Sequence, residues 1–182
     1  MIFVKKIILV LLFIPLISFG QDKPNKKNGL ENLLKKAEEL VGKIGLDNNN
    51  KEKDQTDKNL ENKIIRLWKD YSKAFEYKDY EKVASFFSYP STFGISSTPY
   101  IFKDKSELIK MYKTIREVNI QEGYKYSLLE DYEFFKFSEN ICLLKATYSR
   151  FDANYTKIYT GKGLYFYKKI NADWKMYSME SL

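Results

Sequence analysis

The sequence contains no histidine. Histidine is the commonest general base near neutral pH and the commonest metal ligand, because its unperturbed pKa is about 6.5. Its absence excludes catalytic sites of the Ser-His and Cys-His types and histidine-based metal sites. Acid–base chemistry would have to use a carboxylate whose pKa is raised by burial, beside a tyrosine donor. We find no cofactor motif and no metal motif, and we assign no catalytic residue.

Cysteine is almost absent as well, since Cys142 is the single thiol. One thiol cannot form an internal disulfide, so the fold must be stabilised by a packed core. Cys142 lies in the apolar run 141–144, and a buried free cysteine usually behaves as a small hydrophobic side chain. An intermolecular disulfide is the alternative interpretation.

Long apolar runs are limited to one, at residues 7–19, which two lysines precede. It is too short to span a bilayer, which needs about 20 apolar residues. Ser18 and Gly20 fit the small-residue pattern of a signal peptidase site, and the chain becomes polar directly afterwards. We therefore predict a signal peptide over 1–20, cleavage after Gly20, a periplasmic or secreted mature protein, and no stable membrane anchor after cleavage. An uncleaved anchor is the alternative.

The charge of the chain gives no indication of a nucleic-acid surface. The sequence has 31 basic and 24 acidic residues, for a formal net charge of +7, and both signs are interspersed. Nucleic-acid binding requires basic residues gathered on one face or along one helix. We therefore expect no nucleic-acid partner.

The amino-terminal part of the mature chain, residues 21–46, contains an amphipathic pattern. Apolar residues recur at steps of three and four between 29 and 44, which predicts a helix. Residues 47–59 have no apolar side chain and cannot bury enough surface to offset the entropy cost of ordering. We predict a disordered linker there, so that the helix docks on the main domain, pairs with a second copy or lies on a membrane surface.

The main domain is predicted over 60–182, which is long enough for one hydrophobic core. Helical spacing of apolar residues predicts a first helix over 60–75. Asp79 is placed as the N-cap of a short second helix, and the Tyr89-Pro90 pair is predicted to end it, because a residue before proline avoids the helical region.

Strand patterns dominate the rest of the domain. Two short strands are predicted at 92–95 and 100–102, and Asp104 opens a third helix with a pattern like a capping box. Four aromatic and β-branched runs, separated by short polar breaks, predict long strands at 124–137, 141–151, 156–169 and 174–179. Helices followed by an antiparallel meander indicate an α+β domain whose sheet curls around the helices.

The segments 77–87, 102–112 and 165–176 together resemble the NTF2-like superfamily, which includes SnoaL-like and ketosteroid-isomerase-like proteins. The resemblance implies three N-terminal helices packed in the concave face of a curved, mostly antiparallel sheet. It also implies a cone-shaped pocket and often a homodimer through the sheet. Its members include isomerases, dehydratases and hydrolases, so the resemblance indicates architecture and not function.

Four residues are candidates for ligand binding in such a pocket. Alternation places Trp174 and Glu180 on one face of the last strand, and Tyr148 and Arg150 on one face of the second long strand. Three of them also have a structural interpretation: Glu180 is solvated near the chain end, Arg150 pairs with a surface carboxylate, and Tyr148 packs with its hydroxyl at the rim.

Three functions remain open from the sequence. The first is non-catalytic binding of a small apolar or amphipathic ligand in an aromatic pocket. The second is an isomerase or dehydratase that uses a lone pocket carboxylate, which requires a buried Asp or Glu within hydrogen-bond reach of a Tyr hydroxyl. The third is a protein–protein interaction or dimerisation module.

Overall fold

The computed structural model describes residues 50–96 and 98–182. The predicted signal peptide and the helix predicted over 29–44 lie outside the described residues and stay predictions. The chain divides into two compact units, 1–56 and 57–182, of which the second contains the sheet. No helix in the described part of the chain is both long enough and apolar enough to span a membrane.

The first described helix, α3, spans Asn50–Glu76 and begins earlier than predicted. The predicted disordered linker is therefore wrong over residues 50–59. Glu, Lys and Gln are good helix formers, and extending an existing helix costs much less than nucleating one. In addition, the Asp57 carboxylate accepts a hydrogen bond from Lys136 Nζ at 2.8 Å, which ties this part of the helix to the sheet.

The second helix, α4, spans Tyr80–Ser85, and Asp79 caps it by accepting from the Lys82 amide, as predicted. It ends earlier than expected, because the Tyr89-Pro90 pair lies inside a strand. Proline donates no backbone hydrogen bond and is tolerated where strand pairing is irregular. A register shift between Phe87 and Thr92 provides such a place.

The third helix, α5, spans Lys105–Thr114, and the Asp104 carboxylate accepts from the amides of Ser106 and Glu107. Glu107 accepts in turn from the Lys103 amide at 2.8 Å. A π-helical turn, η2, continues α5 over Ile115–Asn119. Such turns are rare and shift the following side chains around the helix.

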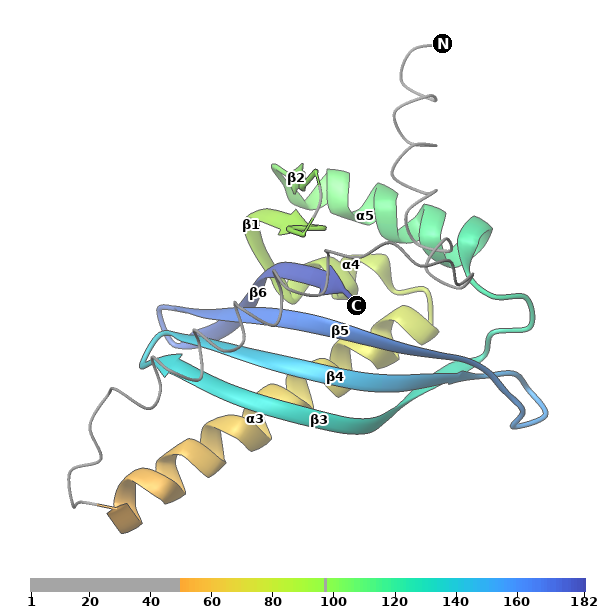
Figure 1. Cartoon of the computed structure of the whole chain (residues 1–182). Coiled ribbons are helices and arrows are strands. Elements are labelled where there is room, and N and C mark those ends of the chain that lie inside the picture. The colour runs from red at the N-terminus through yellow and green to blue at the C-terminus, as the bar shows by residue number, and fades with distance from the viewer. Residues whose placement is uncertain (1–49, 97) are drawn as a thin grey trace, which may run out of the picture. The chain divides into compact units, whose positions relative to one another are not determined.

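Six strands form one curved sheet: β1 (Phe87–Phe93), β2 (Tyr100–Phe102), β3 (Tyr126–Ser138), β4 (Ile141–Phe151), β5 (Lys157–Ile170) and β6 (Asp173–Ser181). Their order is β2-β1-β6-β5-β4-β3, and every pair is antiparallel except β1 and β6. In Figure 1, α3 crosses behind β3, β4 and β5. The predicted α+β class and the four predicted long strands are confirmed.

Aromatic side chains fill the space between the helices and the inner face of the sheet. The Tyr71 ring centre lies 6.0 Å from those of Phe87 and Tyr112, and the Tyr71 and Tyr112 hydroxyls are 2.8 Å apart. Tyr165 and Tyr167 are buried in the same core. The resemblance implied a cone-shaped pocket at this place, and its centre is occupied by the protein's own rings.

Candidate functional site

Tyr148 and Arg150 lie on the inner face of β4 near its end, among other aromatic rings. The Tyr148 ring centre is 6.1 Å from that of Trp68 and 6.3 Å from that of Tyr159. The guanidinium carbon of Arg150 lies 5.5 Å from the centre of the Tyr148 ring and 5.1 Å from that of Tyr159. The structure therefore brings these two predicted residues together in one aromatic site.

Gly161 makes this packing possible. It pairs with Tyr148 across β4 and β5. A Cβ atom at this position would come within 2.7 Å of Tyr148 Cζ and of Tyr159 Cε1, closer than real Cβ contacts. Glycine at this position therefore leaves room for both rings over the strand.

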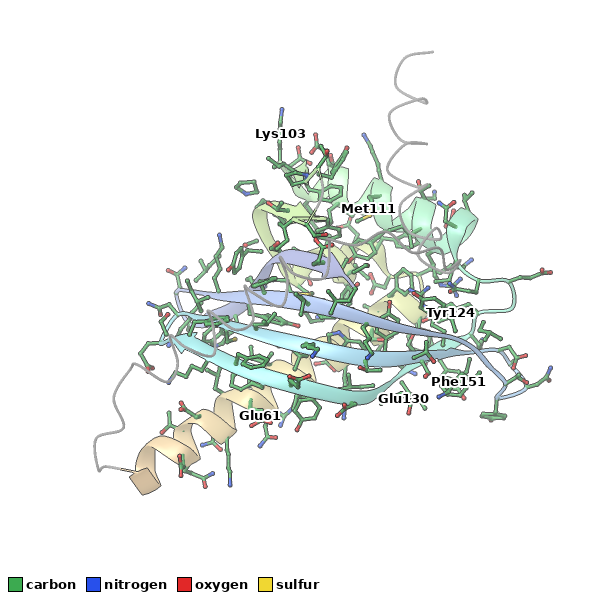
Figure 2. The ribbon with its side chains drawn as sticks, in the orientation of Figure 1. Glu61, Lys103, Met111, Tyr124, Glu130 and Phe151 are labelled. Carbon is green, nitrogen blue, oxygen red and sulfur yellow. The ribbon has the colours of Figure 1, made fainter. Side chains whose placement is uncertain are left out.

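A second arginine reaches the same site from η2. The guanidinium carbon of Arg116 lies 4.6 Å from the centre of the Tyr124 ring, and that of Arg150 lies 5.7 Å from the same ring centre. Figure 2 shows Tyr124 at the end of the sheet where β4 finishes at Phe151. We call Arg116, Tyr124, Tyr148, Arg150 and Tyr159 the arginine–tyrosine cluster.

Arg116 was not among the predicted site residues, although the sequence contained a signal for it. Leu108 and Tyr112 are buried members of α5, and Arg116 follows them at the next step of four. That spacing places its side chain on the buried face of the helix. Arg116 itself is half-buried, and a basic residue that continues the buried face of a helix is unusual.

Neither guanidinium of the cluster has a carboxylate partner among the residues that the structure describes. Arg150 Nη1 donates to Gln121 Oε1 at 2.6 Å, and Arg116 Nη2 donates to the Glu76 carbonyl oxygen at 3.5 Å, so both acceptors are uncharged. The Nε atom of each arginine is enclosed without a hydrogen-bond partner among the described residues. Both side chains are half-buried, so this site holds two partly buried positive charges without a carboxylate partner in the described chain.

Tyr124 and Tyr148 of the cluster remain protonated at neutral pH. Burial raises the pKa of Tyr148 and of Tyr124, and the neighbouring arginines oppose this only in part. A protonated hydroxyl donates a hydrogen bond as well as accepting one. The cluster therefore presents cationic and neutral donors on an aromatic surface.

The other two predicted residues lie elsewhere. Trp174 is buried in the core, and its cross-strand partner on β5 is Lys169. The cross-strand partner of Arg150 is Tyr159, near the opposite end of β5, so Trp174 lies away from the arginine–tyrosine cluster. Glu180 is 6 % exposed, so its interpretation as a solvated residue is wrong.

Glu180 fixes the loop between β1 and β2. Its carboxylate accepts from the Ser96 amide at 3.0 Å and from the Ser96 hydroxyl at 2.7 Å. These bonds satisfy the buried charge and give Glu180 a structural role.

The arrangement that an isomerase or dehydratase requires is not found in residues 50–96 and 98–182. Glu180 is the one buried carboxylate of this part, and it accepts its hydrogen bonds from Ser96 and not from a tyrosine hydroxyl. The hydrogen bond from the Tyr80 hydroxyl to Glu117, at 3.1 Å, involves an exposed carboxylate. The same described residues contain no group of three or more possible metal ligands.

Comparison with known proteins identifies a family over the same region. A family model described as NTF2-like protein (DUF6841) matches residues 61–182. No curated protein matches the chain.

Several solved structures are similar. A Nostoc punctiforme protein with a cystatin-like fold has a TM-score of 0.55 and 13% identity, over 65% of this chain and 86% of that one. A putative scytalone dehydratase from Novosphingobium aromaticivorans has a TM-score of 0.53 and 19% identity, over 69% and 86%. The association domain of CaMKII from C. elegans has a TM-score of 0.54 and 11% identity, over 69% and 97%. At these identities the likeness shows the fold alone.

Proposed function

This chain belongs to the NTF2-like protein family (DUF6841), and on that premise we propose that it is an exported, non-catalytic binding protein. Its ligand is a small amphipathic molecule with an acidic group, held at the arginine–tyrosine cluster. The observation that carries this proposal is the pair of guanidinium groups, Arg116 and Arg150, which contact aromatic rings and have no carboxylate partner in the described chain.

The chemistry of the cluster fits both parts of such a ligand. Arg116 Nη1 and Arg150 Nη2 make no hydrogen bond to the described residues and remain available to a carboxylate, sulfate or phosphate oxygen. The rings of Tyr148 and Tyr159 offer apolar faces to the rest of the molecule. Binding an anion there would neutralise charge that the protein itself leaves unpaired.

A fluorescent fatty acid, dansyl-labelled undecanoic acid, tests the proposal by direct titration. We expect saturable binding to the wild-type protein. Arg150→Met should weaken it about tenfold to a hundredfold, because a hydrogen bond to a charged group contributes about 1.5 to 3 kcal/mol. Arg116→Met should act in the same direction.

Arg66→Met is the matched control, because Arg66 is exposed on α3 and outside the cluster. It should leave the affinity unchanged. The proposal is wrong if the probe does not bind, or if Arg150→Met and Arg66→Met bind it equally well.

Export is part of the proposal and has its own test. The full precursor would be expressed in a bacterial host, and the exported product analysed by native mass spectrometry. We expect a mass that begins at Gln21, because Ser18 and Gly20 supply the small residues that a signal peptidase requires. An intact chain retained in the membrane fraction would contradict this.

The same spectrum reports the oligomeric state, for which we propose a homodimer through the outer face of the sheet. Phe135, Leu143 and Phe166 are cross-strand partners on β3, β4 and β5, and none of them belongs to the core cluster. Leu143 is 3% exposed, whereas Phe135 and Phe166 are half-buried, so these two rings offer the apolar surface for an interface. A monomer at all protein concentrations would count against the dimer and leave the ligand proposal unaffected.

A further inference from the structure

A hollow of about 590 Å³ opens between α3 and the start of β3. Its wall includes Trp68, Lys69 and Lys73 of α3, Lys125 and Tyr126 next to and at the start of β3, and Tyr155 of the β4–β5 turn. No member of the arginine–tyrosine cluster lines it. The volume lies within the range of small-molecule sites, about 300 to 1,000 Å³.

Tyr126 and Tyr155 form an aromatic platform on one side of this hollow, and Phe151, which does not line it, packs against Tyr126. The Tyr126 and Phe151 rings stack with centres 5.1 Å apart and planes 8° apart. The Tyr155 ring meets Tyr126 edge-on at 6.3 Å. Tyr155 is 80% exposed, so its ring adds little to the core and is available to a ligand.

The backbone of Tyr155 indicates that the fold does not require this side chain. Its φ is +65°, in the left-handed region that bulky side chains avoid. Asp152 imposes this geometry, since its carboxylate accepts from the Asn154 amide at 2.8 Å and from the Thr156 amide at 2.9 Å. Glycine would occupy the position without strain, so tyrosine costs stability here and contributes almost no burial.

The charge around the hollow is positive. Glu76 is the carboxylate of its wall, and it is already paired with Lys73 at 3.0 Å. Lys69 and Lys125 form no ion pair within the described part of the chain. An anion beside the aromatic platform would therefore meet two free ammonium groups.

We propose that this hollow is a second binding site, separate from the arginine–tyrosine cluster, for a flat organic anion. The ligand places an aromatic or otherwise planar ring against Tyr155 and Tyr126, and its carboxylate or sulfonate group lies near Lys69 and Lys125. This inference goes beyond the proposed function and does not depend on it.

Naphthalene sulfonate is the probe, titrated into the full mature protein by calorimetry. Tyr155→Gly should weaken its binding about fivefold, the loss expected for one aromatic contact. The same variant should melt at an equal or higher temperature, because it relieves the backbone strain. If the Tyr155 ring had a structural role, Tyr155→Gly would melt at a lower temperature than the wild-type protein.

Two controls, Asn171→Gly and Lys103→Gln, and one further test variant, Lys125→Gln, accompany Tyr155→Gly. Asn171→Gly changes another residue with positive φ, 56°, in the β5–β6 turn, and should leave the affinity unchanged. Lys125→Gln should weaken binding about threefold by removing an exposed charge. Lys103→Gln should have no effect, since Figure 2 shows Lys103 far from the end of the sheet that carries Phe151.

The outcomes separate this site from the cluster. Unchanged affinity in Tyr155→Gly, a fall in its melting temperature, or no binding of the probe would each overturn the second site. If Arg150→Met loses naphthalene sulfonate binding while Tyr155→Gly keeps it, the probe binds at the arginine–tyrosine cluster and not in the hollow. If Arg150→Met keeps the dansyl fatty acid while Tyr155→Gly loses naphthalene sulfonate, the proposed function fails and the second site stands.

Discussion

Raising the pH above about 10 should unfold the domain in one cooperative step, with tyrosinate absorbance appearing together with the loss of secondary structure. Four tyrosines are buried in the core, Tyr71, Tyr112, Tyr165 and Tyr167, and burial is the largest cause that raises the pKa of each above the ordinary value of 10.0. In the unfolded chain the same hydroxyls ionise near that ordinary value.

The sign of the effect follows from where the protons are bound. Below pH 10 both states keep the tyrosines protonated, so their contribution to stability is complete. Above it the unfolded chain releases protons that the folded core retains, and stability falls by about 1.4 kcal/mol per group per pH unit. The four tyrosines together give about 5.6 kcal/mol per pH unit, against a typical total stability of about 5 to 15 kcal/mol.

Cys142 acts in the same direction, because burial raises the pKa of its thiol from 9.0 to about 12. The chain has no histidine, so no imidazole changes its charge between pH 5 and 8. Stability should therefore change little through neutral pH and fall steeply in alkaline solution.

Tyr167→Phe is the sharpest variant for this experiment. The Tyr167 hydroxyl is enclosed and has no hydrogen-bond partner among the described residues, so its removal should not reduce stability at neutral pH. It should make the alkaline loss less steep, since one of the four fully buried tyrosines whose pKa folding raises is gone. Tyrosines that ionise one by one while the circular dichroism stays folded would contradict the prediction.

Trp68→Ala should destabilise the domain by about 3 to 5 kcal/mol, the usual cost of deleting a large aromatic side chain from a core. Trp68 is 2% exposed, and its ring centre lies 5.9 Å from that of Tyr165 and 6.1 Å from that of Tyr148. It joins α3 to the inner face of β4 and β5, so its loss leaves a cavity that these rings fill only in part.

Denaturation by urea, followed by circular dichroism, measures this change. Tyr77→Ala is the matched aromatic control, because Tyr77 is 69% exposed just beyond the end of α3 and should change stability by less than about 0.5 kcal/mol. Equal effects of the two substitutions would mean that the packing of Trp68 does not hold α3 against the sheet.

Trp68→Ala also bears on function through Tyr148. Removing Trp68 frees one side of the Tyr148 ring, on which Arg150 rests. Any loss of ligand binding in this variant is therefore a positioning effect, and only the arginine variants test direct contact with the ligand.

Several features were predictable from the sequence because they depend on neighbours along the chain. The buried face of α3 follows from the three- and four-residue spacing of Ile64, Trp68 and Tyr71. The caps at Asp79 and Asp104 follow from side chains that reach amides two or three residues away. The four long strands follow from their composition and from the polar breaks between them.

Other features required the tertiary structure. The helix over residues 50–59 is attached to the sheet through Asp57 and Lys136, which are far apart in the sequence. The Tyr89-Pro90 pair lies in a strand because β1 finds a parallel partner in β6. Local preference alone favours neither outcome, since each depends on a contact made only in the folded state.

The candidate site shows the same division. Alternation along β4 was enough to place Tyr148 and Arg150 on one face, because side chains in a strand repeat every two residues. The sequence by itself determined the class of fold, the face that each of these residues occupies and the absence of histidine chemistry. Only the tertiary structure decided that the core is filled, that Glu180 binds Ser96, and that Arg116 joins Arg150 around Tyr124, because strand register and helix packing decide which distant residues meet.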